Sequence, residues 1–325
     1  MQMRAAEKVS LLGQTRRRFL GLSPVEATFA KRGFLASEEK ARRHLETIGI
    51  TFLNGYHAAL EETRFVSLAQ RLSIVEVDLR GFAFEGAAMG LALLDSFTPW
   101  RKDRWRTFTE RFAEPHLYMM HVGLGWALAR LRRSVTPHLT RLDPLLRWLV
   151  VDGYGFHEGY FDWTRYIERR EMPARLVGYE RRVFDQGLGR SLWFVKGADV
   201  AAVASAINPF PFARRDDLWS GVGLACAYAG GCARATIQSL RVAADKHLPA
   251  FAQGVAFAAK TRARAGNLNL HTETVCHLIC KHSADETAAI TDAALKDLRE
   301  GGELPAYEIW RRRIQEQLAL EVTST

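Results

Sequence analysis

Cysteine is scarce in this sequence. Four cysteines, at positions 226, 232, 276 and 280, occur in 325 residues, and their spacings match neither a zinc ribbon nor a thioredoxin-type motif. So few in a chain of this size favour a reducing compartment, where we expect buried thiols. The segment 276–282 also contains His277 and His282. Because residues four apart share a helical face, these four side chains are an alternative metal cluster. We predict no metal site and leave any cofactor unknown.

Long apolar runs are absent as well. No uncharged run reaches the roughly 18 residues of a membrane span, and the nearest, 218–233, is rich in glycine. The segment TRRRFLGLSP resembles a twin-arginine export address, which needs an apolar stretch of about 7–15 residues behind the arginines. Pro24, Glu26 and Lys31 interrupt that stretch. We therefore expect a cytoplasmic protein without an export signal, and peripheral membrane contact remains open.

Motifs of several enzyme classes are also missing. There is no G-x-S-x-G nucleophile signature and no P-loop, and GLGRS at 187–191 lacks the strand that precedes a dinucleotide-binding turn. The net charge is +9, with basic clusters at Arg16–Arg18, Arg181–Arg182 and Arg311–Arg313. These clusters are far apart in sequence and accompany no nucleic-acid module, so we interpret them as solvated helix faces and predict no nucleic-acid binding.

Strand signals are nearly absent, because alternating β-branched runs are few and Ala, Leu, Arg and Glu dominate the periodic segments. The sequence therefore predicts an all-α protein. Proline and glycine breaks cut it into pieces that are mostly about 12–28 residues long, as helices or helical pairs should be.

Glycine, by contrast, recurs at a regular interval. Seven segments share a glycine followed by small and apolar residues: NGYHAAL (54–60), EGAAMGL (85–91), VGLGWAL (122–128), DGYGFHE (152–158), QGLGRSL (186–192), SGVGLAC (220–226) and QGVAFAA (253–259). The mean gap is about 33 residues, close to the ~34 residues of tetratricopeptide-like helical pairs. We predict an α-solenoid of about seven repeats over residues 37–300. A basic N-terminal arm and loop (1–36) precede it, and a C-terminal capping helix (301–325) follows.

One position in this register is unusual. The residues four places after each first glycine lie on the same helical face, and six of them are small. They are Ala59, Gly90, Ala127, His157, Ser191, Ala225 and Ala258. A histidine in a space otherwise shaped for a methyl group either packs as a core residue or projects into a cavity.

The residues directly before the glycines are mostly polar, and equivalent positions of stacked repeats line up along one surface. They are Asn54, Glu85, Val122, Asp152, Gln186, Ser220 and Gln253. Such a stripe is either an ordinary wet face or the wall of a pocket, and the bulky aromatics beside the charges favour a pocket. We predict that Glu85, His157 and Glu158 carry out proton transfer. We predict a substrate-binding set of His121, Asp152, Asp185, Gln186, Arg190, Trp126 and Phe156.

Several long motifs carry a family resemblance. RGFAFEGAAMGLALLD, HVGLGWALARL, DPLLRWLVVDGYGFHEGYF, FDQGLGRSLWFV and DLWSGVGLACAYAGG, with others between about residues 16 and 315, resemble the UnbL-type proteins. These are encoded beside an iterative enediyne polyketide synthase, together with UnbV- and UnbU-type companions. The resemblance implies a role in turning a polyene into an enediyne-type core, with those proteins as partners. It supplies no catalytic set.

Two functions follow from these expectations. In the first, the protein binds or acts on an apolar polyene in a concave aromatic groove. In the second, it is a non-catalytic scaffold that gathers the synthase and a membrane partner, and His157 is a core residue. The site residues separate the two, because only the first needs a hollow beside them.

Overall fold

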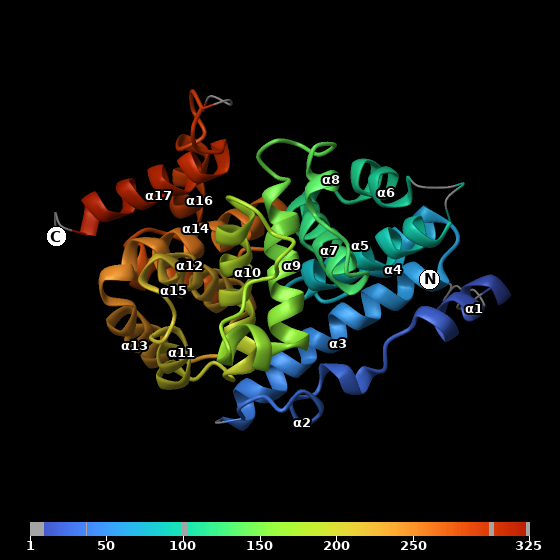
Figure 1. The fold of residues 1–325 in the computed structure, drawn as a ribbon, viewed down its shortest axis with the longest axis horizontal. Coiled ribbons are helices and arrows are strands. Elements are labelled where there is room, and N and C mark those ends of the chain that lie inside the picture. The colour runs from blue at the N-terminus through green and yellow to red at the C-terminus, as the bar shows by residue number, and fades with distance from the viewer. Residues whose placement is uncertain (1–9, 37, 99, 101–102, 299–301, 323–325) are drawn as a thin grey trace, which may run out of the picture.

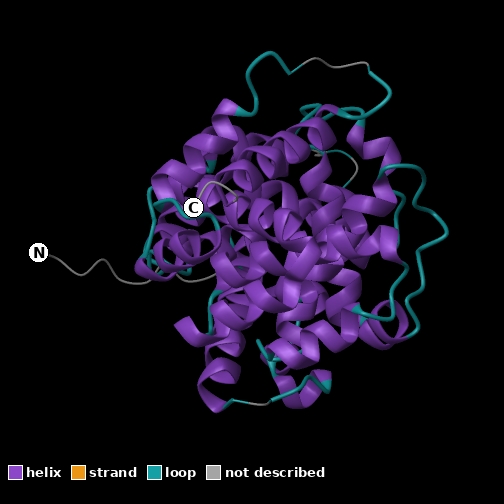
Figure 2. Ribbon diagram, turned by 90° about the vertical axis from the view of Figure 1, so that its left-hand side faces the viewer, coloured by secondary structure: helices purple, strands orange, loops and turns teal. Residues whose placement is uncertain are grey.

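The computed structural model describes residues 10–36, 38–98, 100, 103–298 and 302–322, and within them no strand occurs (Figures 1 and 2). The predicted all-α class is confirmed. Seven long helices each contain one of the glycine segments. They are α3 (Glu39–Glu61), α5 (Arg80–Phe97), α7 (Leu117–Arg130), α9 (Trp148–Phe161), α10 (Glu180–Val195), α12 (Phe212–Ala229) and α14 (Leu248–Ala265).

Shorter helices connect and cover the long ones. They are α4 (Phe65–Ser73), α6 (Arg104–Phe112), α8 (Thr136–Leu139), α11 (Val200–Ile207), α13 (Arg234–Ala244), α15 (Leu270–Ile279) and α16 (Ala284–Ala293). The single turns are η1 (Pro24–Ala27), η2 (Glu114–His116), η4 (Asp245–His247) and a π-type turn, η3 (Thr164–Glu168). Side chains cap several of them. Ser283, for example, forms a capping box with Glu286 at the start of α16.

The seven long helices form a row in chain order. Helix α3 packs against α5, α5 against α7, α7 against α9, α9 against α10, α10 against α12, and α12 against α14. Figure 1 shows α7, α9, α10 and α12 in this order across the molecule. The row curls, so that the chain just after α14 meets the chain just before α5. There, Asn267 donates a hydrogen bond to the carbonyl oxygen of Val77. The inner face of the row therefore surrounds an interior space.

Paired glycines set the spacing of the row. In α9, a Cβ added to Gly153 would overlap the carbonyl oxygen of Val122 on α7, and one added to Gly155 would overlap that of Phe184 on α10. Gly153 thus allows the preceding helix, α7, to approach closely, and Gly155 does the same for the next helix, α10. The same contact with a neighbouring helix's carbonyl recurs at Gly55, Gly86, Gly123, Gly125, Gly187, Gly189, Gly221, Gly223 and Gly254. Neighbouring helices therefore meet backbone to backbone along the row.

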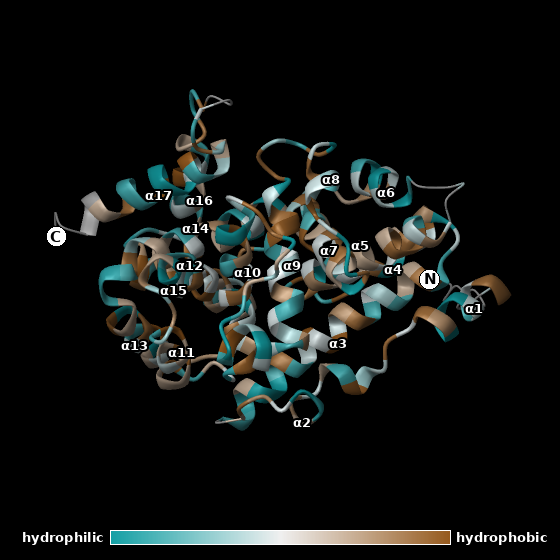
Figure 3. Ribbon diagram, in the orientation of Figure 1, coloured by the Kyte–Doolittle hydropathy of each residue, from teal (hydrophilic) through white to brown (hydrophobic). Residues whose placement is uncertain are grey.

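The two ends of the chain pack differently. Helix α1 (Leu11–Leu20) contacts α3 and leaves Leu11 and Phe19 82% and 78% exposed. Figure 3 shows apolar colour at its ends and polar colour between them. Helix α2 (Phe29–Arg32) follows η1, and Trp163 donates a hydrogen bond to the carbonyl of Arg32. At the other end, α17 (Ala306–Val322) packs on α14 and α16. Among the described helices, none is long and apolar enough to cross a membrane.

Candidate functional site: an aromatic cavity with buried charges

The long helices surround a cavity of about 620 Å³, including space open to solvent, lined by residues of α3, α5, α7, α9, α10, α12 and η1. Aromatic residues make up almost half of its lining. The rings are those of Phe52, Phe82, Trp126, Phe156, Tyr160, Phe161, Phe194 and Tyr228. A second hollow of about 500 Å³ adjoins it, because Arg190, Leu224 and Tyr228 line both.

Two carboxyl groups line this cavity: Glu26 pairs with Arg32 at 2.7 Å, whereas Glu85 forms no ion pair among the described residues. Glu85 is fully buried on α5, and its Oε1 has no hydrogen-bond partner among the described residues. Burial raises the pKa of Glu85 to about 7, and the negative charge of Asp152 adds to this effect. The positive charge of Arg190 and the nearby indole N–H of Trp126 act in the opposite direction. Near neutral pH this carboxyl is therefore present in both forms and is able to give or take a proton.

Two more polar atoms on the wall lack a partner in the described part of the chain. They are Nε1 of Trp126 and the hydroxyl of Tyr228. Buried polar atoms in proteins nearly always find a hydrogen-bond partner, and leaving one unpaired costs about 1–3 kcal/mol. Three such atoms around one hollow are an arrangement that a ligand with a few polar groups would satisfy.

Arg190 and Asp152 form a buried ion pair at the junction of the two hollows. Asp152 also accepts a hydrogen bond of 2.8 Å from Nε2 of Gln186, which in turn lies 3.1 Å from the hydroxyl of Tyr307. The guanidinium of Arg190 lies over the ring of Phe156, 4.9 Å from its centre. The pair is fixed in place by these contacts, so Arg190 presents a stationary positive charge to the cavity.

His157 lies behind the wall rather than on it. Its ring is buried edge-on against Trp126, at 5.6 Å between ring centres, and lies 4.7 Å from Phe161. Neither ring nitrogen has a hydrogen-bond partner among the described residues, and Nδ1 lies 3.6 Å from Oε1 of Glu158. Burial lowers the pKa of His157 despite Glu158, so the ring is neutral at neutral pH. The imidazole contacts a cavity residue without lining the cavity itself.

Besides Gln186, which contacts Asp152, three other predicted site residues line neither hollow. Glu158 faces the partly exposed side of α9, beside His157. The pKa of Glu158 is lowered overall, because His157 and Tyr166 outweigh the upward effect of burial. His121 bonds to the carbonyl of its own helix at Leu117 and packs edge-on against Trp105. All three lie away from Glu85.

The third, Asp185, pairs with Arg214 through two hydrogen bonds of 2.6 and 2.8 Å. Burial nevertheless raises the pKa of Asp185 to about 6. The structure thus brings together Glu85, Asp152, Arg190, Trp126 and Phe156, and places Gln186 directly behind Asp152.

Neighbouring members of the polar stripe contact one another. Besides the bond between Gln186 and Asp152, Ser220 donates to Oε1 of Gln253 at 2.9 Å. These side chains are buried, whereas Asn54 at the start of the stripe is exposed. Most of the stripe is therefore interior, and Glu85, Val122 and Asp152 line the two hollows.

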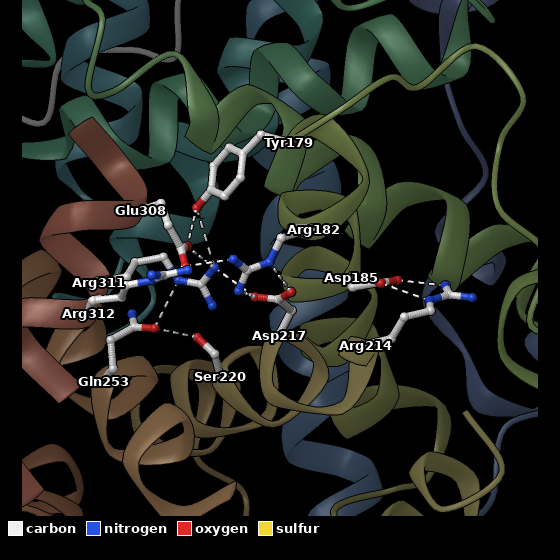
Figure 4. A network of polar contacts seen from close by, with 10 residues as sticks. All are labelled: Tyr179, Arg182, Asp185, Arg214, Asp217, Ser220, Gln253, Glu308, Arg311 and Arg312. Atoms are coloured by element: carbon white, nitrogen blue, oxygen red, sulfur yellow. Dashed lines mark hydrogen bonds and ion pairs between the residues drawn. The ribbon is translucent and has the colours of Figure 1, made fainter. Parts of the chain in front are cut away.

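Two basic clusters from the sequence meet in a second buried network, between α10, α12 and α17 (Figure 4). Arg182 contacts both Asp217 and Glu308, and the fully buried Arg311 contacts the same two carboxylates. Tyr179 donates to Glu308 at 2.8 Å. Our interpretation of these clusters as solvated faces is wrong for Arg182 and Arg311, which hold the C-terminal helix onto the row.

The cysteines are free thiols, and three of them, Cys226, Cys276 and Cys280, are buried as expected. Cys232 is half-buried. The alternative cluster around Cys276 and Cys280 does not assemble, because His277 is exposed and pairs with Glu273 at 2.8 Å.

Sequence reasoning missed several residues of the cavity. Tyr228, Tyr160 and Phe194 each lie two residues beyond a glycine segment, so a comparison limited to those segments did not include them. The signal that would have found them is the helical period, since Tyr160 is four residues after Phe156 and Phe194 four after Arg190.

These features define a class: an all-helical protein whose curled row of glycine-spaced helices encloses an aromatic cavity with a protonatable carboxyl group. The chain belongs to a family described as "Protein of unknown function (DUF1702)", whose model matches residues 11–318. Comparison with curated proteins and with solved structures gives no match.

Proposed function

We propose that the protein binds a long, apolar, conjugated molecule in the cavity and that Glu85 exchanges a proton with it. The observation that carries this proposal is the combination of an aromatic wall with an unpartnered carboxyl group whose pKa is about 7. The resemblance to UnbL-type proteins supports a polyene made by an iterative polyketide synthase as the ligand.

The chemistry of the wall suits such a ligand. Aromatic rings stack on a conjugated chain, and each CH₂ or CH group that leaves water contributes roughly 0.8 kcal/mol. The two hollows share Arg190, Leu224 and Tyr228 in their walls, so together they would offer a long molecule more room than either alone. We regard the row as a solenoid of helical pairs whose inner face supplies this hollow.

The polar groups define the chemistry. A neutral Glu85 donates a proton to a conjugated chain or to a carbonyl at its end, and the carboxylate takes one back. Trp126 and Tyr228 each offer a free donor hydrogen to an oxygen of the ligand. Arg190 would stabilise negative charge that develops during the transfer. His157 would act through Trp126, which it contacts.

Binding is tested with diphenylhexatriene, an uncharged fluorescent triene. We expect saturable fluorescence with the wild-type chain. Ala225→Phe, which fills the cavity from α12, should weaken binding at least tenfold, about 1.4 kcal/mol. The matched control is Val242→Phe on the exposed face of α13, which should bind as the wild type does. Equal binding by both variants would contradict the assignment of the cavity.

Proton transfer is tested separately. Glu85→Gln keeps the size and polarity of the side chain, so we expect polyene binding within a few-fold of wild type and loss of the pathway product in producing cells. Product formation at the wild-type level would leave the binding proposal intact and remove Glu85 from the chemistry.

A second candidate, the scaffold, has one observation in its favour. Helix α1 presents Leu11 and Phe19 to solvent beside Arg16 and Arg18, a surface suited to a partner or an anionic membrane. We propose UnbV- and UnbU-type companions and the synthase as partners. Under this proposal, replacing Leu11 and Phe19 with serine should abolish co-purification of the partner proteins with this chain, whereas Ala225→Phe should leave it unchanged.

A further inference from the structure

Three metal-ligating side chains from two separate parts of the sequence converge at the end of α12. They are Cys226 in its last turn, Cys232 just after it and His271 at the start of α15. One ligand atom from each lies within 4.8 Å of the other two. Cys226 is buried and the other two are half-buried, so the cluster opens toward the surface. This cluster plays no part in the cavity described above.

The turn between the two cysteines is built to bring them together. Gly230 and Gly231 have φ angles of 71° and 87°, in the left-handed region that favours glycine. They end α12 and reverse the chain, which returns Cys232 to Cys226. A further hollow, about 490 Å³ including space open to solvent, is lined by Gly230, Gly231 and His271.

The surrounding backbone is held unusually firmly. The five carbonyl oxygens from Cys226 to Gly230 each contact a side chain from elsewhere, at 2.7 to 2.9 Å. The partners, in order, are His271, Thr272, Arg262, His44 and Trp193. Carbonyl groups at a helix C-terminus otherwise lack partners, and the end of the helix carries partial negative charge that favours a cation.

We propose that Cys226, Cys232 and His271 form a binding site for a soft divalent cation, with zinc as the fitting ion. Two thiolates and one imidazole are zinc's preferred donors, and three protein ligands leave one tetrahedral position for water or an added ligand. The Nε2 atom of His271 donates to the carbonyl of Cys226, which leaves the lone pair on Nδ1 and orients the ring as second-layer contacts do in zinc sites. Binding at about 2.0–2.3 Å requires the three ligand atoms, which lie within 4.8 Å of one another, to move closer together.

The full chain, reduced and treated with chelator, is titrated with Co²⁺ and then with Zn²⁺. We expect one Co²⁺ per chain, a thiolate-to-cobalt charge-transfer band, intense visible bands of tetrahedral geometry and displacement of cobalt by zinc. Cys232→Ser and Cys226→Ser should each weaken Co²⁺ binding at least about 100-fold. His271→Gln, which retains a donor for the Cys226 carbonyl, should weaken it likewise.

The matched controls are Cys276→Ala and Cys280→Ala, which remove the other buried thiols and should leave the spectrum unchanged. Circular dichroism checks that each variant is folded. If Cys226→Ser fails to fold, the half-buried Cys232 and His271 variants decide. X-ray absorption of the zinc-loaded wild type should show two sulfur ligands. Absence of the cobalt band in folded, reduced wild type, or an unchanged band in Cys232→Ser, overturns the site. A chain whose cysteines form only a disulfide also overturns it.

Discussion

The protein buries carboxyl groups in two places, and the two places differ in whether a guanidinium group contacts them. In the network under α17, Asp217 and Glu308 each contact at least two guanidinium groups. In the cavity, Glu85 contacts no cation among the described residues, and its nearest opposite charge, Arg190, is already paired with Asp152. The first arrangement stabilises the packing of a helix. The second leaves a carboxyl group whose protonation changes near neutral pH, which a purely structural role does not require.

The largest effect should come from breaking the paired network. Arg311→Ala removes the guanidinium that two buried carboxylates share, and we expect the free energy of unfolding to fall by about 3–5 kcal/mol in urea titrations. Arg312→Ala is the control, because Arg312 is 51% exposed and, in the described part of the chain, forms its ion pair with Glu308 alone. It should cost less than about 1 kcal/mol. Equal losses would mean that α17 is not held by the buried charges.

Glu85→Gln tests the role of the buried carboxyl group that has no ion-pair partner among the described residues. Because the pKa of Glu85 is raised from 4.5 to about 7, the folded chain holds the proton more tightly than the unfolded chain. Wild-type stability should therefore fall as pH rises from about 4.5 to about 7, by roughly 3 kcal/mol, and level off above. Urea unfolding at pH 5 and pH 8 should show the variant gaining this amount relative to wild type. Glu110→Gln, on the exposed face of α6, should show no such gain.

Gly153→Ala probes the spacing on which the cavity depends. The added methyl group overlaps the backbone of α7, so we expect a loss of about 1–3 kcal/mol in thermal or urea unfolding, and weaker polyene binding. Gly302→Ala, where the added Cβ meets only one atom at 3.9 Å, should stay within about 0.5 kcal/mol of wild type. A tolerated alanine at 153 would show that the helices are able to move apart.

The smallest effect on stability should come from His157→Phe. Both ring nitrogens lack partners and the neighbours are aromatic, so the exchange should change the free energy of unfolding by no more than about 1 kcal/mol. His157→Ala, by contrast, should lose polyene binding through displacement of Trp126 while helicity by circular dichroism is retained. Unchanged binding in His157→Ala together with unchanged product in His157→Phe would end the functional assignment of this residue.

Much of the architecture could be predicted from the sequence, because the glycines mark the points at which neighbouring helices pack closely. The seven segments fall on seven long helices, each against the next, since the glycines are where backbones touch. The same register placed Glu85 and Asp152 beside the hollows. The register did not locate His121 and Asp185 correctly. A residue within one helical turn of the polar stripe can face any of several neighbouring elements, and the sequence does not show which. His121 turns to Trp105 and Asp185 to Arg214.

The remaining features depend on distant parts of the chain. Arg182 and Arg311 looked like surface charge, and their partners Asp217 and Glu308 come from other helices. The approach of His271 to Cys226 and Cys232 likewise depends on how α15 packs against α12. Short-range patterns report the face of a helix, whereas these contacts require the tertiary arrangement.

The backbone contacts at the paired glycines have a consequence for the evolution of this protein. Because main chain meets main chain, the width of the enclosure does not depend on the residues that face inward. Substitutions such as phenylalanine to leucine on that surface would alter the volume and polarity available to a guest while the frame keeps its dimensions. If the cavity binds a ligand as proposed, changes at a few inward-facing positions would fit it to molecules of different shape, provided that the glycines stay.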